Sequence, residues 1–324
     1  MMFVRLAAHV AAGLVVSFAA AQAHAAYPTG PIRLIVPQSA GSGVDSVARI
    51  LSDRMSQTLG QSVVVENKPG ANGVIATAYV AKAKPDGYTL LLSGSSPMTL
   101  NPGLYKHLPY DPINDFTYIA GVAENPFVLV ASKASGLKSF ADLKKAATEH
   151  PGRYTYASAG IGNSTHLATE MVAYKAGIKL MHVPFNGSGP AFSAVLGGQT
   201  DLMSSVVGPA LPQLQAGAAT PLLIIGAGAI PELPGVPSAR DVGLDLPTLP
   251  TWTAVVGPAG MDPAVIKVIE KAVQDAQEDS RLKAQFKAQY LSIYRLAGPA
   301  LTDSIKNDIK VWTGLIHEFG IKAE

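Results

Sequence analysis

Residues 32–59 read IRLIVPQSAGSGVDSVARILSDRMSQTL, and this stretch decides the fold class. Its first part, Ile32 to Val36, is apolar except for Arg33, which is typical of a short buried strand. From Val47 to Leu59, apolar residues recur at the three- and four-residue spacing of one helix face. A strand that passes through a glycine-rich turn into a helix is one βα unit.

The same strand signal recurs along the rest of the chain, and helical patterns separate most of the strands. This alternation predicts an α/β protein in which helices cover mostly parallel sheets. Proline-containing stretches at residues 124–126 and 231–250 interrupt the alternation, and we interpret them as crossings between two lobes. The apolar runs that we interpret as strands are residues 63–65, 89–92, 127–130, 154–157, 181–183, 202–206, 222–225 and 252–256.

The two crossings predict a chain that leaves its first lobe and later returns to it. We expect residues 27–124 and 251–324 to form lobe 1 and residues 125–250 to form lobe 2. Helical spacing over residues 263–276 and 302–316 supports a returning tail that packs on lobe 1. The predicted architecture is therefore a two-lobed α/β protein, with helices flanking a mostly parallel sheet in each lobe.

The first 26 residues predict a removable signal peptide. Arg5 supplies a positive charge, residues 6–21 are almost entirely apolar, and Ala23-His24-Ala25 has the small-x-small pattern of a cleavage site. We therefore expect export to the periplasm, with a mature chain that begins near Tyr27. The alternative is a retained membrane anchor, which would need about 20 clean apolar residues and no cleavage site.

The composition restricts the partners that this protein can have. Of its 324 residues, 48% are hydrophobic and 15% are charged, which suits two packed lobes. The 25 basic and 23 acidic residues form no runs, so nothing predicts binding to nucleic acid or to an anionic membrane. The absence of cysteine excludes disulfides, thiolate catalysis and cysteine-ligated metals. We expect a monomer whose partner is a small molecule or another protein.

A Gly-x-Gly turn that leads into a helical pattern occurs at residues 41–43, 160–162 and 187–189. Glycine lets the backbone come close to a ligand, and a helix N-terminus offers unpaired N–H groups with about half a positive charge. Small hydroxyl residues gather in these loops and in a fourth loop at residues 93–96. Because the four loops contain no lysine or arginine, we predict that amides, hydroxyls and water bind an anion there.

All four loops contribute to the predicted ligand site. Arg49, one turn into the first helix, is more simply a solvated surface charge than a ligand contact. Asp45 is more simply a cap or dipole partner, and it would repel an anion unless it were turned away. The expected ligand-binding residues are Gln38, Ser39, Ala40, Gly41, Ser42, Gly43, Asp45, Ser93, Ser95, Ser158, Gly160, Gly162, Asn163, Ser164, Thr165, Pro184, Phe185, Asn186 and Gly187.

The sequence carries no signature of an enzyme. A dinucleotide-binding fingerprint would need a third glycine where Ser46 stands, and no Gly-x-Ser-x-Gly elbow or phosphate-loop lysine occurs. The histidines after the leader show no close metal-ligand spacing. His166, near a candidate loop, is better explained as a helix-face histidine with a satisfied hydrogen bond. We therefore predict no catalytic residue, no metal and no cofactor.

Six segments carry a resemblance to a known family: PQSAGSGVD at 37–45 followed by Ala48-Arg49, VENKPGA at 65–71, PDGYTL at 85–90, STHL at 164–167, HVPFNG at 182–187 and GGQTD at 197–201. In order and at matching spacing over almost the whole mature chain, they resemble the Bug family. Bug proteins are the receptors of tripartite tricarboxylate transporters, and their fold is similar to that of type II periplasmic binding proteins.

The resemblance implies a two-lobed clamp that meets a carboxylate, often through ordered waters. It assigns the contacts to the loops around residues 41–45, 158–165 and 184–187. The chain departs from the usual family pattern, which predicts a more polar lobe 1 half of the pocket. Family members usually carry an aromatic residue, a proline, a glycine and a hydroxyl residue where this chain has Gln38, Ala40, Ser42 and Val44.

We therefore predict a periplasmic solute-binding receptor that captures a small carboxylate for a tripartite tricarboxylate-type transporter. An aromatic carboxylate or dicarboxylate is favoured, because a pocket without basic side chains suits a flat apolar body with carboxylates at its ends. One alternative is a periplasmic sensor that signals to a membrane sensor kinase. Another is a periplasmic hydrolase or isomerase, for which the sequence offers only serine and aspartate without a recognisable partner.

Overall fold

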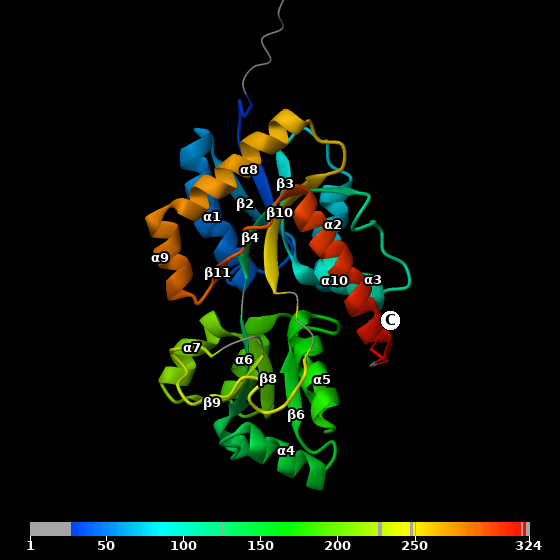
Figure 1. Cartoon of the computed structure of the whole chain (residues 1–324), viewed down its shortest axis with the longest axis vertical. Coiled ribbons are helices and arrows are strands. Elements are labelled where there is room, and N and C mark those ends of the chain that lie inside the picture. Colours follow the sequence, from blue (N-terminus) through cyan, green and yellow to red (C-terminus); the bar gives the residue numbers. More distant parts are fainter. Residues whose placement is uncertain are drawn as a thin grey trace, which may run out of the picture.

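The computed structural model describes residues 27–124, 126–225, 229–246, 249, 251–318 and 320–321. These residues form two α/β lobes that follow one another along the long axis of the molecule (Figure 1). The predicted signal peptide lies outside the described residues. Within the described part of the chain, no helix has the length and apolarity needed to cross a bilayer.

Lobe 1 is built on a six-stranded sheet in the order β11-β4-β10-β3-β1-β2. Its strands are β1 (Ile32–Val36), β2 (Val63–Asn67), β3 (Thr89–Gly94), β4 (Phe116–Glu124), β10 (Trp252–Pro258) and β11 (Ser292–Ile293). Its helices are α1 (Gly43–Leu59), α2 (Val74–Ala81), α3 (Asn101–Leu104), α8 (Pro263–Glu278), α9 (Ser280–Ala288) and α10 (Gly298–Glu318), with the short segments η1 (Ala71–Gly73) and η2 (Ser96–Leu100).

Lobe 2 is built on a five-stranded sheet in the order β7-β6-β8-β5-β9. Its strands are β5 (Phe127–Ser132), β6 (Thr155–Ser158), β7 (Met181–Pro184), β8 (Leu202–Val206) and β9 (Ala219–Ile225). Its helices are α4 (Phe140–Glu149), α5 (Ser164–Ala176), α6 (Ser188–Leu196) and α7 (Val207–Gln215), with the short segment η3 (Lys133–Ser135).

Helices cover both faces of each sheet, and this explains the uninterrupted apolar runs in the strands. In β1, Leu34 packs in a core cluster with residues of α1 and α8, whereas its neighbour Ile35 packs in a second cluster with residues of α2 and α10. In β5, Leu129 and Val130 alternate between two clusters in the same way. The predicted two-lobed α/β architecture is confirmed.

Both sheets are mixed, which differs from the expectation of mostly parallel sheets. β1 pairs in parallel with β2 and β3, and β6 pairs in parallel with β7 and β8. Four of the antiparallel pairs involve β10 in lobe 1 or β5 in lobe 2, which are the strands that bring the chain in from the other lobe, and β4 also pairs antiparallel with β11. β10 and β5 enter their sheets at the edge that faces the other lobe. They therefore run opposite to the parallel strands, whose carboxyl ends point toward that edge.

The exact boundaries between the lobes stay a prediction. The chain leaves lobe 1 after β4 and re-enters it at β10. Asn125, Pro247, Thr248 and Pro250, which belong to the two predicted crossings, lie outside the described residues.

The C-terminal helix α10 extends from lobe 1 toward lobe 2. Trp312, which is fully buried, packs in the same core cluster as Leu104 of α3 and residues of the lobe 2 sheet. Near the end of the helix, the Tyr174 hydroxyl of α5 donates a hydrogen bond to Glu318 Oε1 at 2.6 Å. Part of the apolar core is therefore shared by both lobes.

Candidate functional site

The four predicted loops all follow the carboxyl ends of parallel strands. In lobe 1, residues 38–42 follow β1 and residues 95–96 follow β3. In lobe 2, residues 159–163 follow β6 and residues 185–187 follow β7. Ligands of open α/β sheets bind outside the carboxyl ends of the strands, so this is the edge at which a site is expected.

Side chains within the loop after β1 hold that loop in shape. Ser42 caps α1, because its hydroxyl accepts a hydrogen bond from the Asp45 N–H at 3.2 Å. The Gly41 N–H donates to Asp45 Oδ2 at 2.8 Å, and Gly41 has a φ of 79°, which glycine adopts at little cost. Gln38 is half-buried, whereas residues 39–41 are exposed at the end of the strand.

The Asp45 carboxylate is turned into the loop, and its side chain is only 4% exposed. Its Oδ2 accepts a hydrogen bond from Arg49 Nε at 3.0 Å, and its Oδ1 accepts one from Asn67 Nδ2 at 2.9 Å. Burial alone would raise the pKa of Asp45, but the hydrogen bonds from Arg49, Gly41 and Asn67 outweigh it and lower the pKa. Asp45 therefore shapes the loop, and Arg49 is its ion-pair partner rather than a purely solvated charge.

The loop after β6 is tied to the first turn of α5. Asn163 caps this helix, because its Oδ1 accepts a hydrogen bond from the Thr165 N–H at 3.1 Å. Thr165 Oγ1 accepts a hydrogen bond from the Ala159 N–H at 2.9 Å, which links the start of the loop to the helix. Gly160 and Gly162 have φ values of 132° and 74°, so the loop needs glycine at both positions.

Three stacked rings support this loop. The ring centroids of His166 and His182 lie 3.9 Å apart, and those of His182 and Tyr156 lie 4.8 Å apart. His166 Nδ1 accepts a hydrogen bond from the Gly162 N–H at 3.0 Å, so the expectation of a satisfied helix-face histidine is confirmed. Burial lowers the pKa of His166 to about 3 and that of His182 to about 4, so both rings are uncharged at neutral pH.

The loop after β3 is almost entirely buried. Ser93 has no exposed surface, and its hydroxyl donates a hydrogen bond to the Gly94 carbonyl at 2.9 Å. Ser95 is 5% exposed. The next residue, Ser96, makes the contact with lobe 2, because its Oγ accepts a hydrogen bond from the Ser164 N–H at 3.3 Å. The hydroxyl that reaches the other lobe therefore belongs to the predicted loop but was not among the expected ligand-binding residues.

The loop after β7 lies beside the loop after β6. The Phe185 N–H donates a hydrogen bond to the Ser158 carbonyl at 2.9 Å. Pro184 and Asn186 are exposed, and Gly187 has a φ of 113° just before α6 begins. This loop is thus placed at the same edge of the lobe 2 sheet as Ser158.

Hydrogen bonds bring three of the four loops together, namely those after β3, β6 and β7, and the first of these bonds joins the two lobes. The Ser164 N–H of lobe 2 reaches Ser96 of lobe 1, as described above. A Cβ atom on Gly43, the first residue of α1, would lie 3.9 Å from Cγ2 of Val206 at the end of β8. The loop after β7 joins this group through its hydrogen bond to the loop after β6.

Asn72, which lies between the lobes, was not predicted from the sequence as a residue of the site. Asn72 Nδ2 donates a hydrogen bond to the Gly162 carbonyl at 3.2 Å, and Asn72 Oδ1 accepts one from Asn163 Nδ2 at 3.3 Å. The Asn-Gly dipeptide at residues 72–73 is a turn signal in the sequence, but it contains no indication of a partner about ninety residues away.

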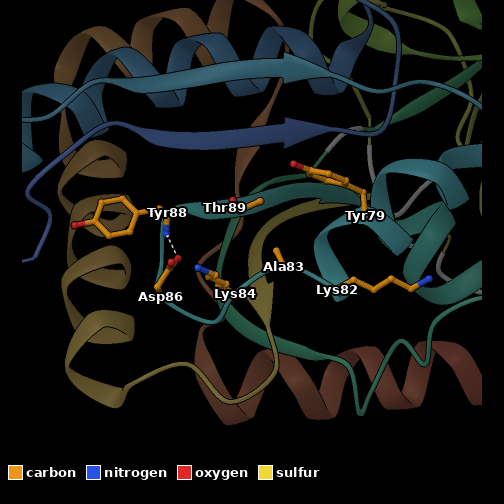
Figure 2. Close-up of a pocket in the computed structure, with 7 residues that line it drawn as sticks. All are labelled: Tyr79, Lys82, Ala83, Lys84, Asp86, Tyr88 and Thr89. Carbon is orange, nitrogen blue, oxygen red and sulfur yellow. Dashed lines mark hydrogen bonds between the residues drawn. The ribbon is translucent and has the colours of Figure 1, made fainter.

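Two hollows on the described surface lie away from these loops. One has a volume of about 390 Å³ and lies at the amino end of β3, where the side chains of Lys82 and Lys84 extend in different directions (Figure 2). The other has a volume of about 480 Å³ and lies beside Pro126 and α9. Because neither contains a residue of the four loops, the candidate site is defined by the convergence of the loops.

The paired sheets and the loops at their facing edges define a two-lobed periplasmic binding protein. A structure of the periplasmic binding protein BugD matches with a TM-score of 0.85 and 30% identity, over 91% of this chain and 99% of BugD. The chain belongs to the tripartite tricarboxylate transporter receptor family, whose model matches residues 47–321. The predicted Bug-type receptor is confirmed, and two solved neighbours at 30% identity or more are a periplasmic binding protein and a periplasmic transporter.

Three further relatives extend this comparison. The protein BugT of Bordetella pertussis is 32% identical over 299 residues, which cover 92% of each chain. The structure of Rhodopseudomonas palustris Rpa4515 with adipate has a TM-score of 0.86 at 27% identity, over 91% of this chain and 99% of that one. The structure of R. palustris MatC with bound malate has a TM-score of 0.83 at 29% identity, over 90% and 100%.

Proposed function

We propose that this chain is a periplasmic receptor that binds a small carboxylate between its lobes and delivers it to a tripartite tricarboxylate-type transporter. One observation carries the proposal: the N-terminus of α5 lies against lobe 1, because the Ser164 N–H donates a hydrogen bond to Ser96 Oγ of that lobe at 3.3 Å. A helix N-terminus binds anions through such N–H groups. Adipate in Rpa4515 and malate in MatC are both dicarboxylates, which supports this ligand class.

The distribution of charge supports binding through amides and hydroxyls. Residues 37–45, 93–99, 158–165 and 184–190 contain no lysine or arginine. Arg49, which lies one turn into the helix that follows the first loop, is hydrogen-bonded to Asp45. A carboxylate in this site would therefore be bound by backbone N–H groups, hydroxyls and water, with the predicted loop residues other than the fully buried Ser93 and Ser158 as its contacts.

The pair of Ser158 and His182 supports a receptor rather than a hydrolase. Their Oγ and Nε2 atoms lie 2.7 Å apart, which is the distance expected for a nucleophile and its base. However, Ser158 has no exposed surface, and its hydroxyl also lies within hydrogen-bonding distance of the Gly160 carbonyl and N–H. A hydroxyl that substrate cannot reach does not act as a nucleophile, so we assign this pair to the support of the loop.

Export to the periplasm and delivery to membrane subunits are part of the same proposal. The leader that ends near residue 26 is removed on export, and the mature receptor meets its ligand in the periplasm. Membrane subunits of the transporter then accept the ligand from the receptor.

The binding proposal is tested by a thermal-shift screen of the mature protein. Malate, adipate and citrate test aliphatic acids, and terephthalate tests the expected aromatic dicarboxylate. A ligand at about 100 times its dissociation constant stabilises the folded state by about 2.7 kcal/mol, which raises the melting temperature by about 5 °C in a chain of this size.

The matched controls are the diamides of the three dicarboxylic acids and the triamide of citric acid, which have a similar shape without the charge. We expect a shift with at least one acid and none with its diamide. Equal shifts with acid and diamide, or shifts only with sugars and cations, would show that the ligand class is wrong.

A further inference from the structure

We infer that Asn72 is a positioning residue that links the two lobes across the site and thereby sets the population of the closed receptor. The inference rests on the proposed function for its ligand. The contact between the lobes is measurable without any ligand, so the role of Asn72 and the proposed binding of a carboxylate can be tested separately.

Asn72 lies in a strained turn of lobe 1. Four successive residues, Gly70 to Gly73, all have positive φ values, and two of them, Ala71 at 46° and Asn72 at 49°, are not glycine. Such conformations persist only where the surrounding structure determines them, and they cluster at functional sites. Asparagine tolerates this conformation better than most residues, so the turn can present an amide side chain to lobe 2.

The Asn72 side chain uses both of its polar atoms at the contact. Its Nδ2 donates to the Gly162 carbonyl at 3.2 Å and to Asn101 Oδ1 at 2.7 Å, while its Oδ1 accepts from Asn163 Nδ2 at 3.3 Å. The contact therefore joins the start of α3 in lobe 1 to the turn before α5 in lobe 2.

Both ends of this bridge are held firmly. In lobe 1, Asn101 has no exposed surface, and its Nδ2 donates to the Asn72 carbonyl at 3.2 Å and to the Tyr110 hydroxyl at 3.3 Å. In lobe 2, the Gly162 N–H is bonded to His166, and Asn163 caps α5. A link between two rigid anchors stabilises one relative position of the lobes and not a range of them.

The bridge lies beside the proposed ligand donors, which connects it to binding. Asn163 immediately precedes Ser164, whose N–H reaches Ser96. When a receptor binds only in its closed state, its apparent dissociation constant equals the intrinsic value divided by the closed fraction. A residue that favours closure therefore increases affinity without contacting the ligand.

The test uses Asn72→Gly, which removes the amide but permits the left-handed backbone. The control is Ala71→Gly, which changes the neighbouring left-handed residue but removes no hydrogen bond between the lobes. Because the natural chain has no cysteine, Lys84→Cys and Lys145→Cys on the exposed surfaces of the two lobes accept a pair of fluorophores. Energy transfer between them reports the separation of the lobes.

We expect Asn72→Gly to shift the ligand-free population toward the open state about tenfold, as the loss of two neutral hydrogen bonds predicts. The affinity for malate or adipate, whichever binds, should fall in proportion to the closed fraction. Ala71→Gly should leave both quantities unchanged.

The outcomes separate this inference from the proposed function. Unchanged energy transfer in Asn72→Gly, or an equal change in Ala71→Gly, would overturn the role of Asn72. An altered energy transfer in a protein that binds none of the tested acids would keep the role of Asn72 in lobe contact and overturn the carboxylate receptor.

Discussion

The substitution Gly162→Ala should weaken ligand binding, because it acts on the contact between the lobes. Gly162 lies in the loop after β6 in lobe 2, with a φ of 74°. A Cβ atom at this position would lie 2.4 Å from Cδ1 of Leu104, at the end of α3 in lobe 1. The substitution therefore strains the backbone of the loop and also crowds the other lobe.

The two effects have different magnitudes and different consequences. A left-handed alanine costs about 1–2 kcal/mol, and this cost applies whether the lobes are open or closed. Carbon atoms are ordinarily about 3.5–4.0 Å apart, so the contact with Leu104 has to relax, and such overpacking costs about 1–3 kcal/mol. Rotation of the Leu104 tip limits that cost to the lower part of the range, since an off-rotamer side chain costs about 0.5–1.5 kcal/mol. This second cost applies only to closed lobes and predicts about a tenfold loss of affinity.

Gly177→Ala is the matched control for the cost of placing alanine in a left-handed backbone conformation. Gly177 ends α5 with a φ of 68°, and no atom lies within 4 Å of the position that a Cβ atom would take there. This variant should lose a similar free energy of unfolding without losing affinity. Leu104→Ala in the Gly162→Ala background should restore the affinity toward that of Leu104→Ala alone. The single Leu104→Ala variant is needed as a reference, because loss of a buried leucine itself costs about 2–5 kcal/mol.

Isothermal titration calorimetry with the acid identified in the thermal-shift screen measures the affinities, and urea unfolding measures the stabilities. The reasoning is refuted if Gly162→Ala and Gly177→Ala lose equal affinity, or if Leu104→Ala restores nothing. Either result would mean that the lobes do not approach each other at Gly162 when the ligand is bound.

Two further predictions concern the side chains that hold the loops. The folded protein should lose stability as the pH falls from about 7 to about 5. In the unfolded chain, His166 and His182 take up protons near their ordinary pKa of about 6.5. In the folded protein, burial lowers their pKa values to about 3 and about 4, so both rings stay uncharged over this pH range. The free energy of unfolding can fall by up to about 1.4 kcal/mol per pH unit for each histidine. Urea unfolding of His166→Gln should show a shallower dependence of this free energy on pH. An equal slope in the variant would mean that burial of His166 does not cause the loss of stability. Asp45→Asn should lower the free energy of unfolding by about 2–4 kcal/mol, because the amide N–H₂ of asparagine would face the donors of Arg49 and Gly41, or that of Asn67. The control Asp303→Asn, at a side chain that is 77% exposed, should cost less than about 0.5 kcal/mol. Equal costs in urea unfolding would show that Asp45 does not hold the loop.

The sequence predicted those features that depend on neighbouring residues. The apolar run of β1 and the helical spacing of α1 were both recognisable, because a strand covered on both faces and a helix covered on one face impose different apolar patterns. The composition of the glycine-rich loops also placed the candidate site at the ends of strands, since glycine permits backbone angles that other residues avoid.

Strand β4 shows where such patterns fail. It has nine residues and pairs with β10 and β11, yet its sequence was not recognised as a strand. Gly121 lies near the middle of this strand. Glycine is needed there because a Cβ atom would lie 2.4 Å from Cδ1 of Tyr294. A glycine that is required by a residue far along the chain resembles, in the sequence, an ordinary interruption of a strand.

The amino-acid sequence by itself determined the α/β class, the glycine turns and the absence of basic residues from the four loops, because these depend on composition and on spacing within a few residues. Only the tertiary structure decided that Asp45 turns into its own loop toward Asn67, and that Asn72 and Ser96 meet the loop before α5. These partners lie 22 to 90 residues apart along the chain. Their pairing depends on how whole sheets and lobes pack against each other, and local backbone preferences contain no record of that packing.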